Sequence, residues 1–140
     1  VLATGDTGGL PDLTSKLLDR SIGQTAGNTK INLVLALSYG SRAEIAGAAR
    51  KIAQKIAAGE LRPDAITEET FGQYLDTAGM PDPDLLIRTS GEMRISNFLL
   101  WQISYAELYL TDTLWPDFSE QDMEAAVKDY ARRTRRLGGI

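Results

Sequence analysis

The sequence predicts an α/β fold in which a mainly parallel sheet is flanked by helices. Three observations support this prediction. Residues 31–37 are apolar almost throughout, which is typical of a strand buried on both faces of a parallel sheet. Residues 84–89 form a second strand-like run, and stretches with helical periodicity precede and follow both runs. Alternation of strands and helices along a chain favours a parallel sheet covered by helices.

The first half of the chain is expected to contain two strands and two helices. Residues 1–4 resemble a short strand, and a helix that starts near Pro11 is expected to end at about residues 27–28. Its apolar positions are Leu10, Leu13, Leu17 and Ile22. After the strand at residues 31–37, Ser41 and Glu44 have the spacing of a capping box that starts the next helix. The apolar stripe of that helix, which is expected to end at Gly59, is formed by Ile45, Ala48, Ala49, Ile52 and Ile56.

The second half is expected to add two strands between two further helices. A shorter helix is predicted from near Thr67 to about Ala78, before the strand at residues 84–89. Residues 106–111 are predicted to form another strand. Ser119 is the expected cap of the last helix. The buried face of that helix is predicted to consist of Met123, Val127, Tyr130 and Ala131.

Composition narrows the chemistry that the chain can perform. Its 140 residues suit one domain, and 43% apolar with 24% charged residues is typical of a folded globular protein. The 15 basic and 19 acidic residues give a net charge of −4, which argues against a protein that coats nucleic acid. There is no cysteine and no histidine, so thiolate nucleophiles, imidazole bases and zinc sites made of these residues are excluded. A metal ion here would be a hard cation bound by oxygen, with magnesium the leading candidate.

The polar loop at residues 88–97 is the first candidate for a binding site. It follows a predicted strand, and in parallel α/β sheets ligands bind beyond the carboxyl ends of the strands. Arg88 and Arg94 each present a planar fork of N–H donors that matches phosphate oxygens, and the Ser96 hydroxyl adds another polar group. Gly91 allows a tight turn between them. The alternative is that the two arginines form ordinary surface ion pairs with neighbouring acidic residues.

Glu107 is the second candidate, because a carboxylate is unusual within the apolar strand at residues 106–111. A partly buried charge is costly unless it is paired or bound to a metal. Magnesium commonly uses one or two carboxylates together with substrate phosphates, so Glu107 fits such a role. An ion pair with a nearby arginine, or an outward position on an edge strand, explains the residue equally well.

A long stretch of the chain resembles the cis-prenyltransferase family. The run DLLIRTSGEMRISNFLLWQISYAELYLTDTLWPDF, residues 84–118, carries the resemblance. Shorter matches lie at residues 26–29, at residues 38–45 and in the terminal RRLGG at residues 135–139. The resemblance covers essentially the whole chain. It implies a parallel α/β sheet flanked by helices, a requirement for Mg²⁺, and condensation of isopentenyl diphosphate onto an allylic diphosphate with new cis double bonds.

The resemblance also assigns roles to individual residues. It implies that Arg88, Arg94 and Ser96 bind the diphosphate of isopentenyl diphosphate and that Glu107 is a magnesium-linked carboxylate. Arg136 and Gly138 resemble an element that reaches across a homodimer to complete the partner's isopentenyl diphosphate site. The expected product is a long-chain polyprenyl diphosphate such as undecaprenyl diphosphate. We accordingly expect a cytoplasmic enzyme, without nucleic-acid partners, that contacts the membrane peripherally through its lipid product.

Several family features have no counterpart in residues 1–140. The resemblance implies an essential aspartate, within a D-G-N-G-R-W-A motif, and this is expected upstream of Val1. Residues 1–140 are therefore expected to be the C-terminal portion of a single cis-prenyltransferase domain, inactive when isolated. Two alternatives remain open: a non-catalytic relative that acts as a binding subunit, and a generic anion-binding α/β domain.

Overall fold

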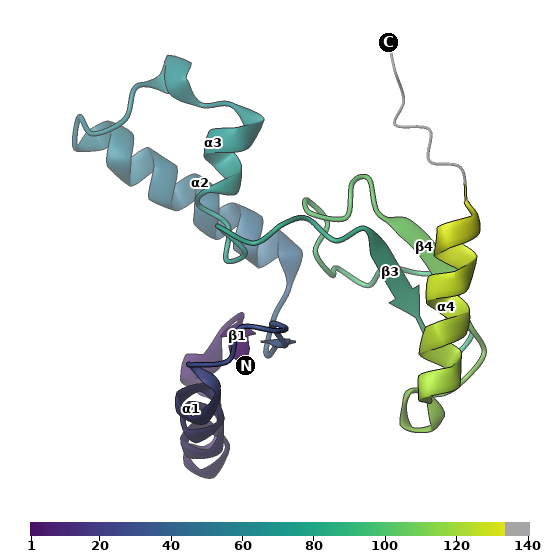
Figure 1. Ribbon diagram of the computed structural model, residues 1–140. Helices are drawn as coiled ribbons and strands as arrows, with labels where there is room; N and C mark the ends of the chain where they lie inside the picture. Colours follow the sequence, from purple (N-terminus) through teal and green to yellow (C-terminus); the bar gives the residue numbers. More distant parts are fainter. Residues whose placement is uncertain (134–140) are drawn as a thin grey trace. The chain divides into compact units, whose positions relative to one another are not determined.

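The computed structural model describes residues 1–133, and the chain divides into two compact units, Val1–Met80 and Pro81–Ile140 (Figure 1). Each unit contains a two-stranded parallel sheet and helices, which confirms the α/β class. The described strands lie in two such sheets, one in each unit. None of the helices in the described part of the chain is long and apolar enough to span a membrane.

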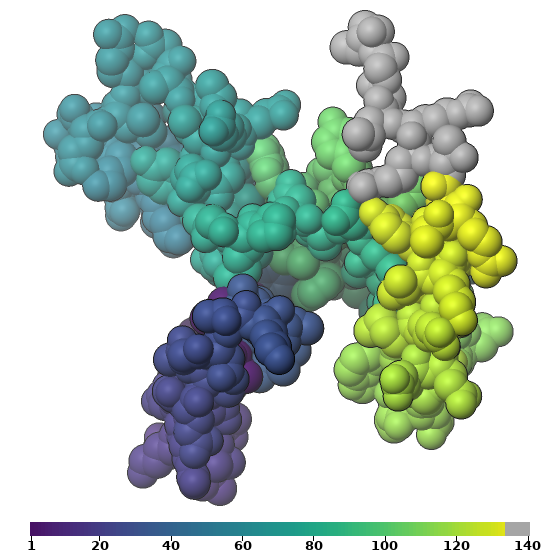
Figure 2. All heavy atoms as spheres, in the orientation of Figure 1, coloured from purple at the N-terminus to yellow at the C-terminus, as the bar shows by residue number. Residues whose placement is uncertain are grey.

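In the first unit, β1 (Leu2–Thr4) pairs in parallel with β2 (Val34–Ala36). Between them lie a 3₁₀ turn, η1 (Thr7–Gly9), and helix α1 (Asp12–Thr25). The expected strand at residues 31–37 is shorter than predicted, and it is not buried on both faces. The side chains of Ile31 and Leu33 are 82% and 55% exposed. All residues of α1 are likewise partly or fully exposed, and Figure 2 shows its atoms, in purple and dark blue, open on the surface.

The loop after β1 touches the loop after β2. Gly5 has φ +96°, and a Cβ atom there would lie 2.2 Å from the carbonyl oxygen of Leu37 and 2.9 Å from the Cβ of Tyr39. The Leu37 N–H donates to the carbonyl oxygen of Thr4 at 2.9 Å, so the parallel pairing continues to this point. Only glycine fits such an approach in this backbone region.

Helix α2 (Ser41–Ala57) begins differently from the prediction. Gly40 occupies the cap position and Ser41 is the first helical residue, so the predicted Ser41–Glu44 capping box is wrong. Glu44 makes tertiary contacts instead: its carboxylate accepts the Tyr39 hydroxyl at 2.5 Å and the Asp76 N–H at 2.9 Å. These bonds satisfy a carboxylate that is only 7% exposed. Ala48 and Ile52 of the predicted stripe are buried, as expected.

The rest of the first unit contains η2 (Pro63–Ala65) and the short helix α3 (Glu68–Gly72). The predicted start at Thr67 is confirmed, since its hydroxyl accepts the Thr70 N–H and the Thr70 hydroxyl accepts the Thr67 N–H. The helix is shorter than predicted because the chain continues as a series of turns up to Met80. Leu75, in these turns, is 4% exposed and belongs to the core of the unit.

In the second unit, β3 (Leu85–Arg88) pairs in parallel with β4 (Glu107–Leu110), followed by η3 (Trp115–Asp117) and α4 (Glu120–Arg132). Both strands were predicted. The predicted face of α4 is wrong in its centre: Met123 and Val127 are 47% and 50% exposed, whereas Ala126 is fully buried. A small residue at this position allows the helix to approach its neighbours closely, and the larger side chains remain on the open side.

The predicted cap of α4 is confirmed and makes a testable contribution to stability. The Ser119 hydroxyl accepts the Asp122 N–H, and the Asp122 carboxylate accepts both the hydroxyl and the N–H of Ser119. The Ser119 hydroxyl, followed by the Ser119 N–H, lowers the pKa of the Asp122 carboxyl below its ordinary value of 3.8. We expect Ser119→Ala to lower the free energy of unfolding by about 1 kcal/mol, measured by urea denaturation at pH 7.

The same carboxyl predicts how this contribution depends on pH. Because the folded-state pKa is lowered, the stabilisation is present above pH 3.8 and is lost as the pH falls through the folded-state value. The difference between wild type and Ser119→Ala should therefore shrink on acidification below pH 3.8. An unchanged difference between pH 7 and pH 2.5, about a unit below this value, would show that the carboxylate does not contribute to the cap.

Candidate functional site

A cavity of about 370 Å³ lies on one face of the β3–β4 sheet. Because alternate residues of a strand point to the same face, the pairs Leu86–Leu108 and Arg88–Leu110 bring four lining side chains together. Residues 93–95 of the following loop complete the lining. The cavity therefore combines an apolar floor with two arginines, and the structure brings the predicted pair Arg88 and Arg94 to one place.

Arg88 is the better buried of the two arginines. It is the last residue of β3, and its Nε atom is buried with no hydrogen-bond partner among residues 1–133. A buried donor without a partner is costly and rare in folded proteins. Arg88 therefore has hydrogen-bonding capacity that no described residue uses, and it also lines the cavity.

Arg94 lies at the mouth of the same cavity. Its side chain is 68% exposed and its Nη1 atom forms an ion pair with the Glu92 carboxylate at 2.6 Å. The ion pair that was the alternative explanation is thus present for Arg94. An exposed pair of this kind is worth little on its own, so a ligand with two or more negative charges can compete for the guanidinium.

The loop reaches this position through a strained turn. Ser90 and Gly91 have φ values of 69° and 64°, in the left-handed region, which costs a non-glycine residue energy. Their N–H groups donate to the carbonyl oxygens of Thr113 and Thr111, both at 2.9 Å. Ser96, Asn97 and Leu99 also have positive φ values, and such strain often gathers at functional sites.

The other predicted residues of the binding site lie apart from this cavity or outside the described residues. Ser96 is exposed and is not among the described residues that line the cavity. Arg136 and Gly138 lie outside the described residues. Their predicted roles, and that of Ser96, remain predictions.

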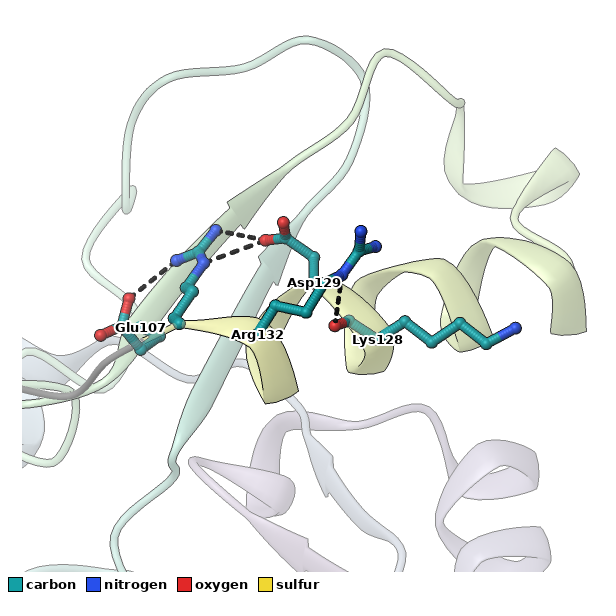
Figure 3. A network of polar contacts seen from close by, with 5 residues as sticks. Glu107, Lys128, Asp129 and Arg132 are labelled. Carbon is teal, nitrogen blue, oxygen red and sulfur yellow. Dashed lines mark hydrogen bonds and ion pairs between the residues drawn. The ribbon is translucent and has the colours of Figure 1, made fainter.

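Glu107 lies on the face of β4 opposite to the cavity-lining Leu108 and Leu110. Its carboxylate accepts a hydrogen bond from the Arg133 guanidinium at 2.7 Å, and the same guanidinium donates two bonds to Asp129 at 2.7 and 3.0 Å (Figure 3). Glu107 first, and then Asp129, raise the pKa of Arg133 above its ordinary range. Figure 3 also shows Arg132 donating to the backbone carbonyl of Lys128. The ion pair, one of the alternatives for Glu107, is therefore present.

A magnesium site would need several oxygen ligands close together. Among residues 1–133, no group of three or more acidic side chains is placed to hold a metal ion. Glu107 and Asp129 are bridged by the cationic Arg133, whose charge opposes a second cation between them. The described residues alone therefore do not fit a resident magnesium ion.

The first unit has a cavity of its own at the carboxyl ends of β1 and β2. It measures about 580 Å³, and the polar loop at residues 38–40 contributes to its lining. Arg50 and Lys51 line it together with Asp6 and Asp76, and Lys51 is 3.7 Å from Asp76. Because both charge signs meet there, this cavity suits an anion less well than the cavity at Arg88.

Sequence reasoning found the two arginines but missed the apolar part of their site. Leu86, Leu108 and Leu110 form a continuous patch beside Arg88. Alternation along the two predicted strands was the available signal, because it places every second residue on the same face. No sequence pattern linked Arg133 to Glu107.

The chain is similar to prenyltransferases over its whole length. The family described as "Putative undecaprenyl diphosphate synthase" matches residues 1–138. The isoprenyl transferase of Geobacillus kaustophilus is 52% identical over 140 residues, which is 100% of this chain and 54% of the relative. That of Porphyromonas gingivalis is 50% identical over 138 residues, covering 99% of this chain and 54% of the relative. The chain thus spans about half the length of the curated relatives it matches.

Solved structures agree with these sequence relatives. The lavandulyl diphosphate synthase of Lavandula x intermedia, solved in complex with dimethylallyl diphosphate, superposes with a TM-score of 0.94 at 44% identity, covering 99% of this chain and 59% of that one. A probable undecaprenyl diphosphate synthase from Campylobacter jejuni gives 0.81 at 34% identity, covering 98% and 62%. Fold, sequence and the match at residues 1–138 agree, and the chain belongs to the prenyltransferase family of undecaprenyl diphosphate synthases.

Proposed function

We propose that the cavity beside β3 and β4 binds isopentenyl diphosphate for transfer to an allylic diphosphate, and that the chain serves in the synthesis of a long-chain polyprenyl diphosphate such as undecaprenyl diphosphate. Arg88 carries the proposal, because its guanidinium lines the cavity, has no described partner at Nε and favours an anionic acceptor. The apolar floor beside it suits a small hydrocarbon group attached to that acceptor.

Different residues of the cavity are proposed to contact the two parts of the ligand, its diphosphate and its isopentenyl group. Arg88 and Arg94 present guanidinium groups that match diphosphate oxygens and remain charged at any working pH. Leu86, Leu108 and Leu110 cover the isopentenyl group and keep water away from it. In the reaction these groups hold the acceptor double bond in place while the allylic C–O bond breaks and diphosphate leaves as an anion. A C–C bond forms between the allylic carbon and the isopentenyl double bond, and the isopentenyl unit loses one proton, which the released diphosphate can accept. Positioning two substrates and excluding water are the main demands of such a transfer.

Ser96, Arg136 and Gly138 are proposed to complete the isopentenyl diphosphate site. The last two would do so across a homodimer, each chain adding them to its partner's site. Magnesium is proposed only for the complete enzyme, and we derive no step through it, since Glu107 is held by Arg133 on the other face of the sheet. We also propose that the enzyme is cytoplasmic and that it contacts the membrane peripherally through its lipid product.

Arg94→Ala tests the outer part of the site. We expect affinity for isopentenyl diphosphate, measured by titration calorimetry on the 140-residue chain, to fall about three- to tenfold. The effect is moderate because the side chain is 68% exposed and must leave Glu92. Glu92→Gln is the matched control, since it frees Arg94 and should leave affinity equal or higher. Unchanged affinity in Arg94→Ala would remove this arginine from the site.

We further propose that residues 1–140 form the C-terminal portion of one catalytic domain whose essential aspartate lies in an N-terminal portion. The experiment combines this chain with the separately expressed N-terminal half of the Geobacillus kaustophilus isoprenyl transferase, which is 52% identical over the shared half. With Mg²⁺, farnesyl diphosphate and isopentenyl diphosphate, we expect negligible turnover from the chain alone and polyprenyl diphosphate from the pair. Turnover by the isolated chain would contradict this proposal, and absence of complementation would favour a non-catalytic binding subunit.

A further inference from the structure

A chain of hydrogen bonds joins the start of α4 to the loop that carries Arg94. The Thr111 hydroxyl donates to the Thr113 hydroxyl oxygen at 3.1 Å, and the Thr113 hydroxyl donates to Oδ1 of Asp122 at 3.2 Å. Oδ2 of the same carboxylate accepts the hydroxyl and the N–H of Ser119, at 2.5 and 2.8 Å. Both carboxylate oxygens of Asp122 are therefore used, one for the helix cap and one for Thr113.

The other end of this chain of bonds is the strained turn. The carbonyl oxygens of Thr113 and Thr111 accept the N–H groups of Ser90 and Gly91, each at 2.9 Å. Ser90 adopts a left-handed conformation at φ 69°, although this conformation is energetically unfavourable for a residue other than glycine. Strain of this kind persists only when the surroundings over-determine it, and here the two carbonyl groups supply that constraint.

The segment at residues 111–113 is itself held by side chains. The Thr111 hydroxyl accepts the Thr113 N–H at 3.3 Å, which closes a small turn, and the Thr111 N–H donates to the Arg88 carbonyl oxygen at 3.0 Å. Thr113 is the one residue of the segment bonded both to Ser90, through its backbone, and to α4, through its side chain. Losing its hydroxyl would detach the segment from the helix and leave Asp122 with one partner fewer.

We propose that Thr113 is a positioning residue for the isopentenyl diphosphate site. Its hydroxyl fixes the carbonyl groups that hold the turn at Ser90 and Gly91. This turn places Arg94 beside Arg88. This inference rests on the proposed function. It assigns Thr113, which does not line the cavity among the described residues, a part in setting ligand affinity.

Amide hydrogen exchange tests the turn without any ligand. In the 140-residue chain, Thr113→Val removes the hydroxyl and keeps the shape, whereas Thr113→Ser keeps the hydroxyl. We expect the Ser90 and Gly91 amides to exchange about tenfold faster in Thr113→Val and at the wild-type rate in Thr113→Ser. The amides of β3 and β4 are the internal reference and should be unchanged, which separates a loosened turn from a chain that fails to fold.

Titration with isopentenyl diphosphate then tests the positioning itself. We expect Thr113→Val to weaken binding about three- to tenfold, and Thr113→Ser to bind as the wild type does. Adding Ser90→Gly to Thr113→Val should recover affinity, because glycine adopts the left-handed conformation without strain.

Each alternative result would overturn a specific part of the inference. Wild-type exchange rates at Ser90 and Gly91 in Thr113→Val would show that the hydroxyl does not hold the turn. Faster exchange with unchanged affinity would show that the turn does not position the arginines. A wild-type chain that binds no isopentenyl diphosphate would instead contradict the proposed function, and the exchange rates would still decide whether Thr113 holds the turn.

Discussion

Arg88→Gln is expected to lower affinity for isopentenyl diphosphate about 100-fold, the largest effect of any substitution in the site. Hydrogen bonds to charged groups contribute about 1.5–3 kcal/mol, and tenfold in affinity corresponds to about 1.4 kcal/mol. Arg88 should reach the upper part of this range because its Nε atom is already buried and has no partner within residues 1–133. Titration calorimetry on the folded chain measures the effect.

Two control variants define what Arg88 contributes. Arg88→Lys keeps the charge but loses the planar fork, so it should recover only part of the affinity. Arg62→Gln makes the same chemical change in the first unit, where Arg62 and its ion-pair partner Asp64 both lie. The Arg62 side chain is 82% exposed, and its substitution should leave the affinity for isopentenyl diphosphate unchanged. If Arg88→Gln bound isopentenyl diphosphate as the wild type does, the cavity would not be the binding site.

Gly5→Ala is expected to lower the free energy of unfolding of the first unit by about 2–5 kcal/mol. A left-handed backbone costs an L-residue about 1–2 kcal/mol, and forcing extra atoms into a packed region costs about 1–3 kcal/mol more. The clash at Gly5 is severe because the new Cβ would lie 2.2 Å from the Leu37 carbonyl oxygen, which belongs to the backbone. Thermal unfolding followed by circular dichroism measures the loss.

A second glycine provides the matched control. Gly23 lies within α1, and a Cβ atom there would meet nothing within 4 Å. Gly23→Ala should therefore stabilise the protein by about 0.5–1 kcal/mol, as expected for alanine in a helix. Equal stability of Gly5→Ala and wild type would mean that the loops after β1 and β2 do not meet as described.

The sequence predicted which segments form strands and helices better than it predicted what they bury. Residues 84–89 and 106–111 became β3 and β4, and Ser119 caps α4 as its residue type requires. Ser41, in contrast, has the same type and spacing but does not cap α2, because Glu44 bonds to Tyr39 and Asp76 instead. Local patterns cannot reveal that a carboxylate is used by residues distant in the sequence.

In the candidate site, too, the sequence predicted individual residues better than it predicted their contacts. Arg88 and Arg94 were found from the chemistry of their side chains, but their shared cavity depends on the register that pairs Leu86 with Leu108. That register is set when the two strands pair, so it depends on residues that are far apart in the sequence. Glu107 could be flagged as unusual from the sequence, whereas its partner Arg133 is 26 residues away and required the structure.

Titration of the folded wild-type chain with isopentenyl diphosphate and with inorganic diphosphate shows whether this cavity recognises isopentenyl diphosphate. We expect isopentenyl diphosphate to bind at least tenfold more tightly, because burying two of its carbon atoms against Leu86, Leu108 and Leu110 contributes about 1.6 kcal/mol. Equal affinity for the two ligands would contradict the claim and leave a generic anion-binding domain.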